Sequence, residues 1–163
     1  YHSGPRHLSE VDQMTLEWAG CYRRYHAAMM RTVLIGEVTQ QHQDMHRVAT
    51  QALKACEDAL IPGNTLGDVF LAHANVMDSG GYRDHRLNAC GYTMGCAYAP
   101  IWVDYPMIYE GNPMVVEENM VFFLHMIIIN RDNRLAMCPG HSVIVGANGV
   151  ERLSQTALDL EVR

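Results

Sequence analysis

The spacing of apolar residues between positions 39 and 60 constrains the fold more than any other feature of the sequence. Apolar side chains recur there every three or four residues, as one buried helix face requires, and a Pro-Gly pair follows at 62–63 as a stop signal. A second helix is predicted from Thr65, whose hydroxyl can form a capping box with Asp68, to the Ser-Gly-Gly at 79–81. Two consecutive helices therefore occupy the middle of the chain.

Strand patterns lie on both sides of these helices. Residues 14–20 and 22–36 predict a hairpin with its turn at Gly20-Cys21, and residues 121–129 and 142–145 predict central strands. Residues 82–113 are rich in Gly, Pro and aromatic residues and are predicted to be a long irregular loop, the kind of segment that often carries function. The order strands, helices, strands predicts an α+β fold, with helices packed on one side of a curved, mostly antiparallel sheet.

Composition and charge exclude two kinds of partner. The 163 residues are 48% hydrophobic and 18% charged, which suits one globular domain. A formal net charge of -6 without a long basic run argues against nucleic acid. The longest apolar stretch, residues 120–129, is about half of the ~20 residues that a membrane helix needs. Five cysteines without a C-x-x-C pair, and no signal peptide, favour a reduced, cytoplasmic protein.

Five short strings occur in the order in which the pita-bread superfamily carries them. They are the hairpin that leads to Arg31-Thr32 and Gly36, the helix before segment 62–68, the Gly-Tyr-Thr-Met-Gly loop at 91–95, the Asn-Met-Val-Phe string at 119–122, and the closing strand at 143–149. The chain thus resembles the methionine aminopeptidases, prolidases and creatinases over essentially its whole length. The resemblance implies the pita-bread fold and a single C-terminal, catalytic-type domain over residues 1–163.

The peptidase members of this superfamily hold two divalent metal ions with four carboxylates and one histidine. The matching positions in this chain are Glu17, Ala28, Tyr92, His125 and Gly140. Only Glu17 and His125 could bind a metal, and two cations need several anionic oxygens to offset the cost of dehydration. We therefore expect neither a metal nor another cofactor.

The strings at 16–26, 91–95 and 123–126 are most similar to the metal-free ectoine hydrolase and creatinase types. This predicts a metal-independent hydrolase of a C–N bond in a small ectoine-, creatine-, amidine- or guanidino-like substrate. His125 and His26 could transfer the proton, Glu17 could hold a cationic substrate, and Tyr92 could stabilise an oxyanion. Three further residues are expected to bind substrate: Arg31, His141 and Tyr98.

Structural explanations compete with these roles. His125 is flanked by apolar residues and could belong to the core, His26 could lie on a solvated strand face, Glu17 could be a paired strand carboxylate, and His141 could be a turn residue.

Two other functions stay open. The first is a metal-dependent Xaa-Pro peptidase with ligands among Asp104, Glu110, Glu117 and Glu118. The second is a non-catalytic binding module on the same fold. The resemblance also implies an additional N-terminal domain, so that the chain is expected to be a fragment, and a homodimer whose other partner is a small-molecule substrate.

Overall fold

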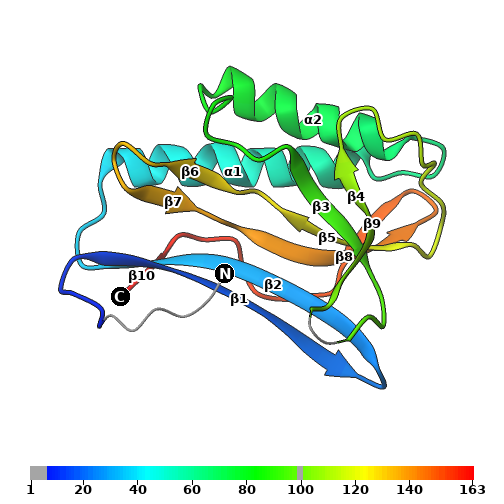
Figure 1. Cartoon of the computed structure of the whole chain (residues 1–163), viewed down its shortest axis with the longest axis horizontal. Coiled ribbons are helices and arrows are strands. Elements are labelled where there is room, and N and C mark those ends of the chain that lie inside the picture. The colour runs from blue at the N-terminus through cyan, green and yellow to red at the C-terminus, as the bar shows by residue number, and fades with distance from the viewer. Residues whose placement is uncertain (1–6, 99–100) are drawn as a thin grey trace.

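The computed structural model describes residues 7–98 and 101–163, which form a curved sheet with two helices on one side (Figure 1). The elements follow in the order β1 (Asp12–Tyr22), β2 (Tyr25–Ile35), α1 (Gln40–Ala59), α2 (Leu66–Ser79), β3 (Ala89–Met94), β4 (Val103–Tyr109), β5 (Val121–His125), β6 (Ile128–Asn130), β7 (Leu135–Met137), β8 (Gly140–Gly146), β9 (Gly149–Arg152) and β10 (Glu161–Val162). The predicted α+β class with helices on one side is confirmed.

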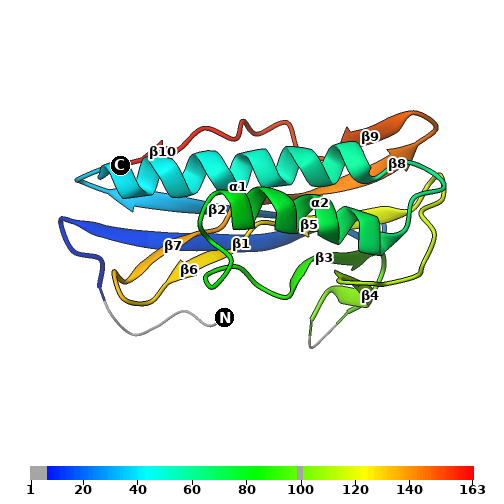
Figure 2. The same ribbon diagram turned by 90° about the horizontal axis from the view of Figure 1, so that it is seen from above.

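The main sheet has the strand order β1-β2-β8-β5-β3-β4, and every neighbouring pair in it is antiparallel. Strand β9 pairs antiparallel with β8, and the short β10 pairs parallel with β2. Strands β6 and β7 form a separate two-stranded ribbon. Seen from above, α1 and α2 lie side by side over the sheet (Figure 2). Within the described residues, no helix is both long and apolar enough to cross a membrane.

Both helices begin where their capping residues predict. The Thr39 side chain accepts a hydrogen bond from the backbone N–H of His42, and Thr65 forms a capping box with Asp68. Because caps satisfy backbone N–H groups that have no partner inside the helix, they define the first turn locally. The predictions of both helices are confirmed.

Alternation along the central strands divides the buried residues into two layers. In β5, Phe122 and Leu124 belong to the core beneath the helices, whereas Phe123 packs with Met30 and Tyr92 on the opposite face. Successive strand residues point to opposite faces, so His125 lies on the same face as Phe123. We call the face turned away from the helices the inner face.

Three details of the predicted strands are wrong. The hairpin turn lies at Arg23-Arg24 rather than at Gly20-Cys21, because β1 and β2 pair without interruption as far as Tyr22 and Tyr25.

The apolar run at 121–129 is not one strand. It leaves the main sheet after His125 and continues as β6 in the separate ribbon.

The stretch at 82–113 is not simply a loop, since it contains β3 and β4. Register shifts in their pairing interrupt the two-residue alternation by which strands are recognised.

Candidate active site

Four residues lie in one row across four neighbouring strands of the inner face. Glu17 of β1 pairs with Met30 of β2, Met30 with Gly140 of β8, and Gly140 with His125 of β5. Directly opposed residues in antiparallel strands share a face, so the row carries Glu17 and His125 on the same side of the sheet. Their backbones are three strand spacings apart, about 14 Å in a flat sheet.

The adjoining row contains the other two positions that correspond to peptidase metal ligands. The Ser142 hydroxyl accepts a hydrogen bond from the Ala28 N–H at 2.9 Å and donates to the Ala28 carbonyl at 3.1 Å. Ser142 pairs with Phe123, which in turn pairs with Tyr92. All five positions matched by the resemblance therefore lie on the inner face, in two adjacent rows.

Aromatic rings surround His125. The ring centroid of His125 lies 5.7 Å from that of Tyr92 and 5.8 Å from that of Phe123, and the side chain is only 5% exposed. Its Nδ1 atom is buried and has no hydrogen-bond partner among the described residues. Burial lowers the pKa of His125 to about 4, because the charged imidazolium loses its hydration. The imidazole is neutral at pH 7 and available as a hydrogen-bonding group.

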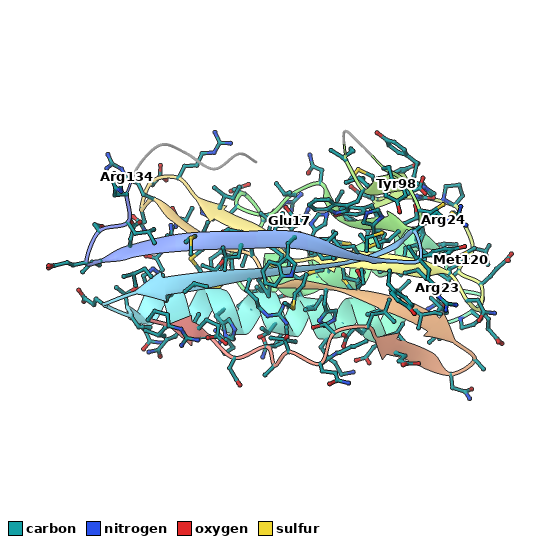
Figure 3. The ribbon with its side chains drawn as sticks, turned by 90° about the horizontal axis from the view of Figure 1, so that it is seen from below. Glu17, Arg23, Arg24, Tyr98, Met120 and Arg134 are labelled. Carbon is teal, nitrogen blue, oxygen red and sulfur yellow. The ribbon has the colours of Figure 1, made fainter. Side chains whose placement is uncertain are left out.

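Glu17 lies midway along β1, away from the arginines at the hairpin end (Figure 3). Burial raises the pKa of its carboxyl above the ordinary value. Its neighbourhood includes the Cys138 thiol, whose pKa is raised by burial and, to a lesser extent, by the charge of Glu17. A half-desolvated carboxylate of this kind favours a cationic ligand, which would restore its ionised form.

His26 and Tyr98 form a second cluster, nearer the hairpin end. Their ring centroids are 4.9 Å apart, and the Tyr98 hydroxyl lies 3.1 Å from Sγ of Cys21, the residue directly opposite His26. His26 precedes Met30 by four strand residues, about 13 Å along β2. The structure thus does not bring His26 and Tyr98 into the row of Glu17 and His125.

Arg31 lies on the helix side of the sheet. Its Nη1 donates to the carbonyls of Met30 and Gly140, both at 2.7 Å, and its other nitrogens donate to the carbonyls of Thr156 and Ala157. These bonds use the guanidinium to fasten the C-terminal segment to the sheet. Its position does not support the predicted role in binding substrate.

His141 also lies on the helix side, because its neighbour Gly140 belongs to the inner face. Its Nε2 lies 2.6 Å from Oε1 of Glu57 on α1, and both side chains are buried. Arg152 donates to both oxygens of the same carboxylate at 2.7 Å. His141 therefore joins the sheet to a helix and does not reach the inner face.

Sequence reasoning missed two polar residues of the inner face. Ser142 follows His141 in β8, so strand alternation alone could have assigned it to the inner face. Trp102 donates a hydrogen bond from Nε1 to the Tyr92 hydroxyl at 3.0 Å. No sequence signal indicated Trp102, since β4, which follows it directly, was not predicted.

The side chains present do not fit a two-metal centre. Among residues 7–98 and 101–163, no three His, Cys, Asp or Glu side chains are close enough to share a metal ion. Position 140 also lacks space for a side chain, because a Cβ atom there would lie 2.7 Å from the Leu124 carbonyl oxygen and 3.0 Å from the ring of Phe123.

The carboxylates that a metallopeptidase would require lie elsewhere. Glu110, Glu117 and Glu118 are exposed, and Oδ1 of Asp104 accepts the backbone N–H of Tyr105. None of them forms a metal-binding group with Glu17 and His125 in the described part of the chain.

The two-helix curved sheet and the five matched positions on its inner face define a pita-bread domain. Residues 1–151 match the model of metallopeptidase family M24, and the chain belongs to that family.

Two curated relatives are similar over most of this chain. It is 31% identical to an uncharacterized hydrolase/peptidase of Sinorhizobium fredii over 97% of its own length and 40% of that protein's. It is 28% identical to the ectoine hydrolase of Halomonas elongata over 90% of its own length and 36% of that enzyme's. The chain thus spans about two fifths of the length of these relatives.

A solved structure has the same fold. The dipeptidase PepE from Mycobacterium ulcerans superimposes with a TM-score of 0.89 at 23% identity, over 98% of this chain and 42% of the other.

Proposed function

We propose that this chain carries the catalytic face of a hydrolase that cleaves a C–N bond in a small non-peptide substrate without a pair of divalent metal ions. The substrate class that suits the face best is a cationic amidine or guanidino compound, of which ectoine and creatine are examples. The observation that carries this proposal is the row from Glu17 to His125, which holds one carboxylate and one imidazole in a family whose name refers to metal.

Charge on the inner face supports a cationic substrate. Glu17 is half-buried, and burial raises the pKa of its carboxyl, so its ionised form is less well solvated than in water. Arg31, which directly follows the Met30 that pairs with Glu17, is on the other face and bonded to backbone carbonyls. An amidinium or guanidinium group placed against Glu17 would stabilise its ionised form.

The proposed reaction is the addition of water to the amidinium carbon. The water oxygen bonds to that carbon while neutral His125 accepts one proton from the water, and His125 passes this proton to the departing nitrogen as one C–N bond breaks. The proton left on the added oxygen is released as the carbonyl forms and is taken up by the free amine, which leaves as an ammonium ion. Tyr92 donates a hydrogen bond to the oxygen that has become attached to the carbon. The products are an amide, or a urea from a guanidinium, and an amine.

The relatives support two readings of the substrate. The ectoine hydrolase of Halomonas elongata favours a cyclic amidine, whereas the dipeptidase from Mycobacterium ulcerans favours a peptide. The donor set on the inner face favours the first, because a metal-dependent peptidase needs the carboxylates that positions 28, 125 and 140 lack.

One set of assays tests the proposal. The protein, purified without added metal, is incubated with ectoine, creatine and a Xaa-Pro dipeptide, each with and without a chelator. Turnover of an amidine or guanidino compound that the chelator leaves unchanged is the expected result. Dipeptide turnover abolished by the chelator would establish the peptidase alternative. Binding of the small molecules without turnover would indicate a non-catalytic module.

A further inference from the structure

The indole of Trp102 and the hydroxyl of Tyr92 are joined by a hydrogen bond whose direction is determined by chemistry. The bond measures 3.0 Å between Nε1 of Trp102 and the Tyr92 oxygen. An indole nitrogen can only donate, so the phenol oxygen must be the acceptor. The hydroxyl proton of Tyr92 therefore points along a different direction from the Trp102 contact.

The ring of Tyr92 is held in place around this bond. Tyr92 is only 4% exposed, and its ring centroid lies 5.2 Å from that of Phe123 and 5.7 Å from that of His125. Its backbone pairs with Phe123 on one side and with Met107 on the other. The indole contact restricts the torsion of the hydroxyl proton.

We propose that Trp102 is a positioning residue, which turns Tyr92 into a hydrogen-bond donor for the reaction on the inner face. This inference rests on the proposed function, because it specifies how Tyr92 comes to face the oxygen that water adds to the substrate carbon. A phenol can donate or accept in solution. With its oxygen occupied by the indole N–H, Tyr92 is biased toward donation, as a hydrogen bond to the oxygen that water adds to the substrate carbon requires.

A double-mutant cycle tests this assignment through activity. Trp102→Phe removes the N–H and keeps an aromatic ring, and Tyr92→Phe removes the hydroxyl. We expect Trp102→Phe to lower kcat by roughly tenfold to a hundredfold, less than the ~10² to 10³ lost when such a donor is removed altogether, with little change in KM. The same change made in Tyr92→Phe should have almost no further effect on kcat. Equal losses in both backgrounds would show that Trp102 does not act through the hydroxyl.

A spectroscopic measurement decides the question without any substrate. The intensity ratio of the tyrosine Fermi doublet in the Raman spectrum reports whether a phenol oxygen accepts or donates. Subtracting the spectrum of Tyr92→Phe isolates Tyr92 from the other tyrosines. An acceptor signature that is lost in Trp102→Phe is the expected result, and an unchanged ratio would overturn the inference.

These two measurements fail independently. If the protein turns over none of the tested substrates, the proposed function fails while the Raman comparison still reports on Trp102. If activity is present and the ratio is unchanged, only the role of Trp102 is lost. Chemical denaturation of each variant verifies folding, and Trp102→Leu, which also lacks a donor, replaces Trp102→Phe if that variant does not fold.

Discussion

Nε2 of His141 lies 2.6 Å from Oε1 of Glu57, although 84 residues separate them in the sequence. Arg152 binds the same carboxylate from the next strand. One buried carboxylate on α1 thus holds β8 and β9 together beneath the helix.

We expect Glu57→Ala to lower the free energy of unfolding by roughly 2–4 kcal/mol, because it leaves His141 buried without its partner and Arg152 without its counter-ion. Asp58→Asn is the matched control. Asp58 is the next residue and pairs with Lys54 on the surface, where such a bond contributes less than about 1 kcal/mol. Urea denaturation of both variants makes the comparison, and similar losses would mean that the buried network is not what stabilises α1.

Acid should destabilise the protein in two separate windows of pH. Burial lowers the pKa of both His73 and His125 to about 4, whereas an unfolded histidine titrates near 6.5. Between these values the unfolded state binds more protons, so the free energy of unfolding falls as the pH falls from about 6.5 to about 4. Each histidine should contribute on the order of 1–3 kcal/mol. Denaturation of His73→Gln should show a shallower slope in this window, and an unchanged slope would contradict the prediction.

The second window belongs to Glu57. Burial alone would raise the pKa of this carboxyl, but hydrogen bonds and charge from His141 and Arg152 outweigh burial and lower the pKa to about 2. Its stabilisation is complete above the unfolded pKa near 4.3 and is lost as the pH falls through about 2. Wild-type protein should therefore lose stability below pH 4 more steeply than Glu57→Ala.

A glycine substitution in the hairpin turn should stabilise the protein. Arg23 and Arg24 have φ values of 47° and 73°, in a left-handed region that costs residues with a Cβ atom roughly 1 kcal/mol each. Arg24→Gly should raise the free energy of unfolding by about 1 kcal/mol. Arg24→Ala removes the same charge but keeps the Cβ atom, and it should give no gain. Thermal denaturation of the two variants separates backbone strain from charge.

Local sequence signals were sufficient to predict the helices. The strand features that were predicted wrongly depend on pairings between residues distant in sequence. Thr39 and Thr65 cap their helices through residues three positions away, so a short window contains the whole signal. The hairpin turn is determined by the register of β1 on β2, and the glycine at position 20 was a misleading indicator of it.

Strand alternation explains which site residues the structure brings together. Glu17, Tyr92 and His125 lie on one face because their strand partners do. Arg31 directly follows Met30, and His141 directly follows Gly140, so neither can share that face in a regular strand. Alternation was sufficient to separate them, whereas the position of Trp102 beside Tyr92 depends on a loop path that no pattern encodes.

Metal analysis tests the inner face most directly. With Glu17 and His125 as its only ionic or imidazole donors among the five matched positions, the face should bind a divalent cation weakly, since affinity follows ligand count and charge. Protein purified without added metal should contain no stoichiometric Mn, Co, Zn or Fe. Two bound ions per chain would overturn the assignment of these positions.

The close approach at Gly140 should prevent a simple return of the lost carboxylate. Gly140→Ala should cost about 1–3 kcal/mol, because its Cβ atom would press on the backbone oxygen of Leu124. Gly20→Ala is the matched control, since a Cβ atom there meets nothing within 4 Å. Gly140→Glu should be at least as unstable as Gly140→Ala and should still bind no metal. Denaturation and elemental analysis of the same samples check both points.

His125→Ala, the simplest test of the imidazole, should abolish turnover while the protein still folds. His125→Gln fills more of the buried space and should lower kcat by about 10² to 10⁴, the usual contribution of a proton-transfer group. For each variant, kcat and the free energy of unfolding are both measured. Wild-type activity in either variant, or unfolding of both, would place His125 in the core rather than in the reaction.

The strand order determines when each part of the sheet can form during synthesis. Strand β2 is among the first parts of this chain to be made, but its sheet neighbours β8 and β10 come near the end. The carbonyls that receive the Arg31 guanidinium lie as many as 126 residues later. On the ribosome the two helices can form early from local contacts, while the central sheet cannot close until nearly all of these residues have emerged. A chain interrupted before β8 would therefore expose its longest hairpin unpaired on one edge, as a target for chaperones or proteases.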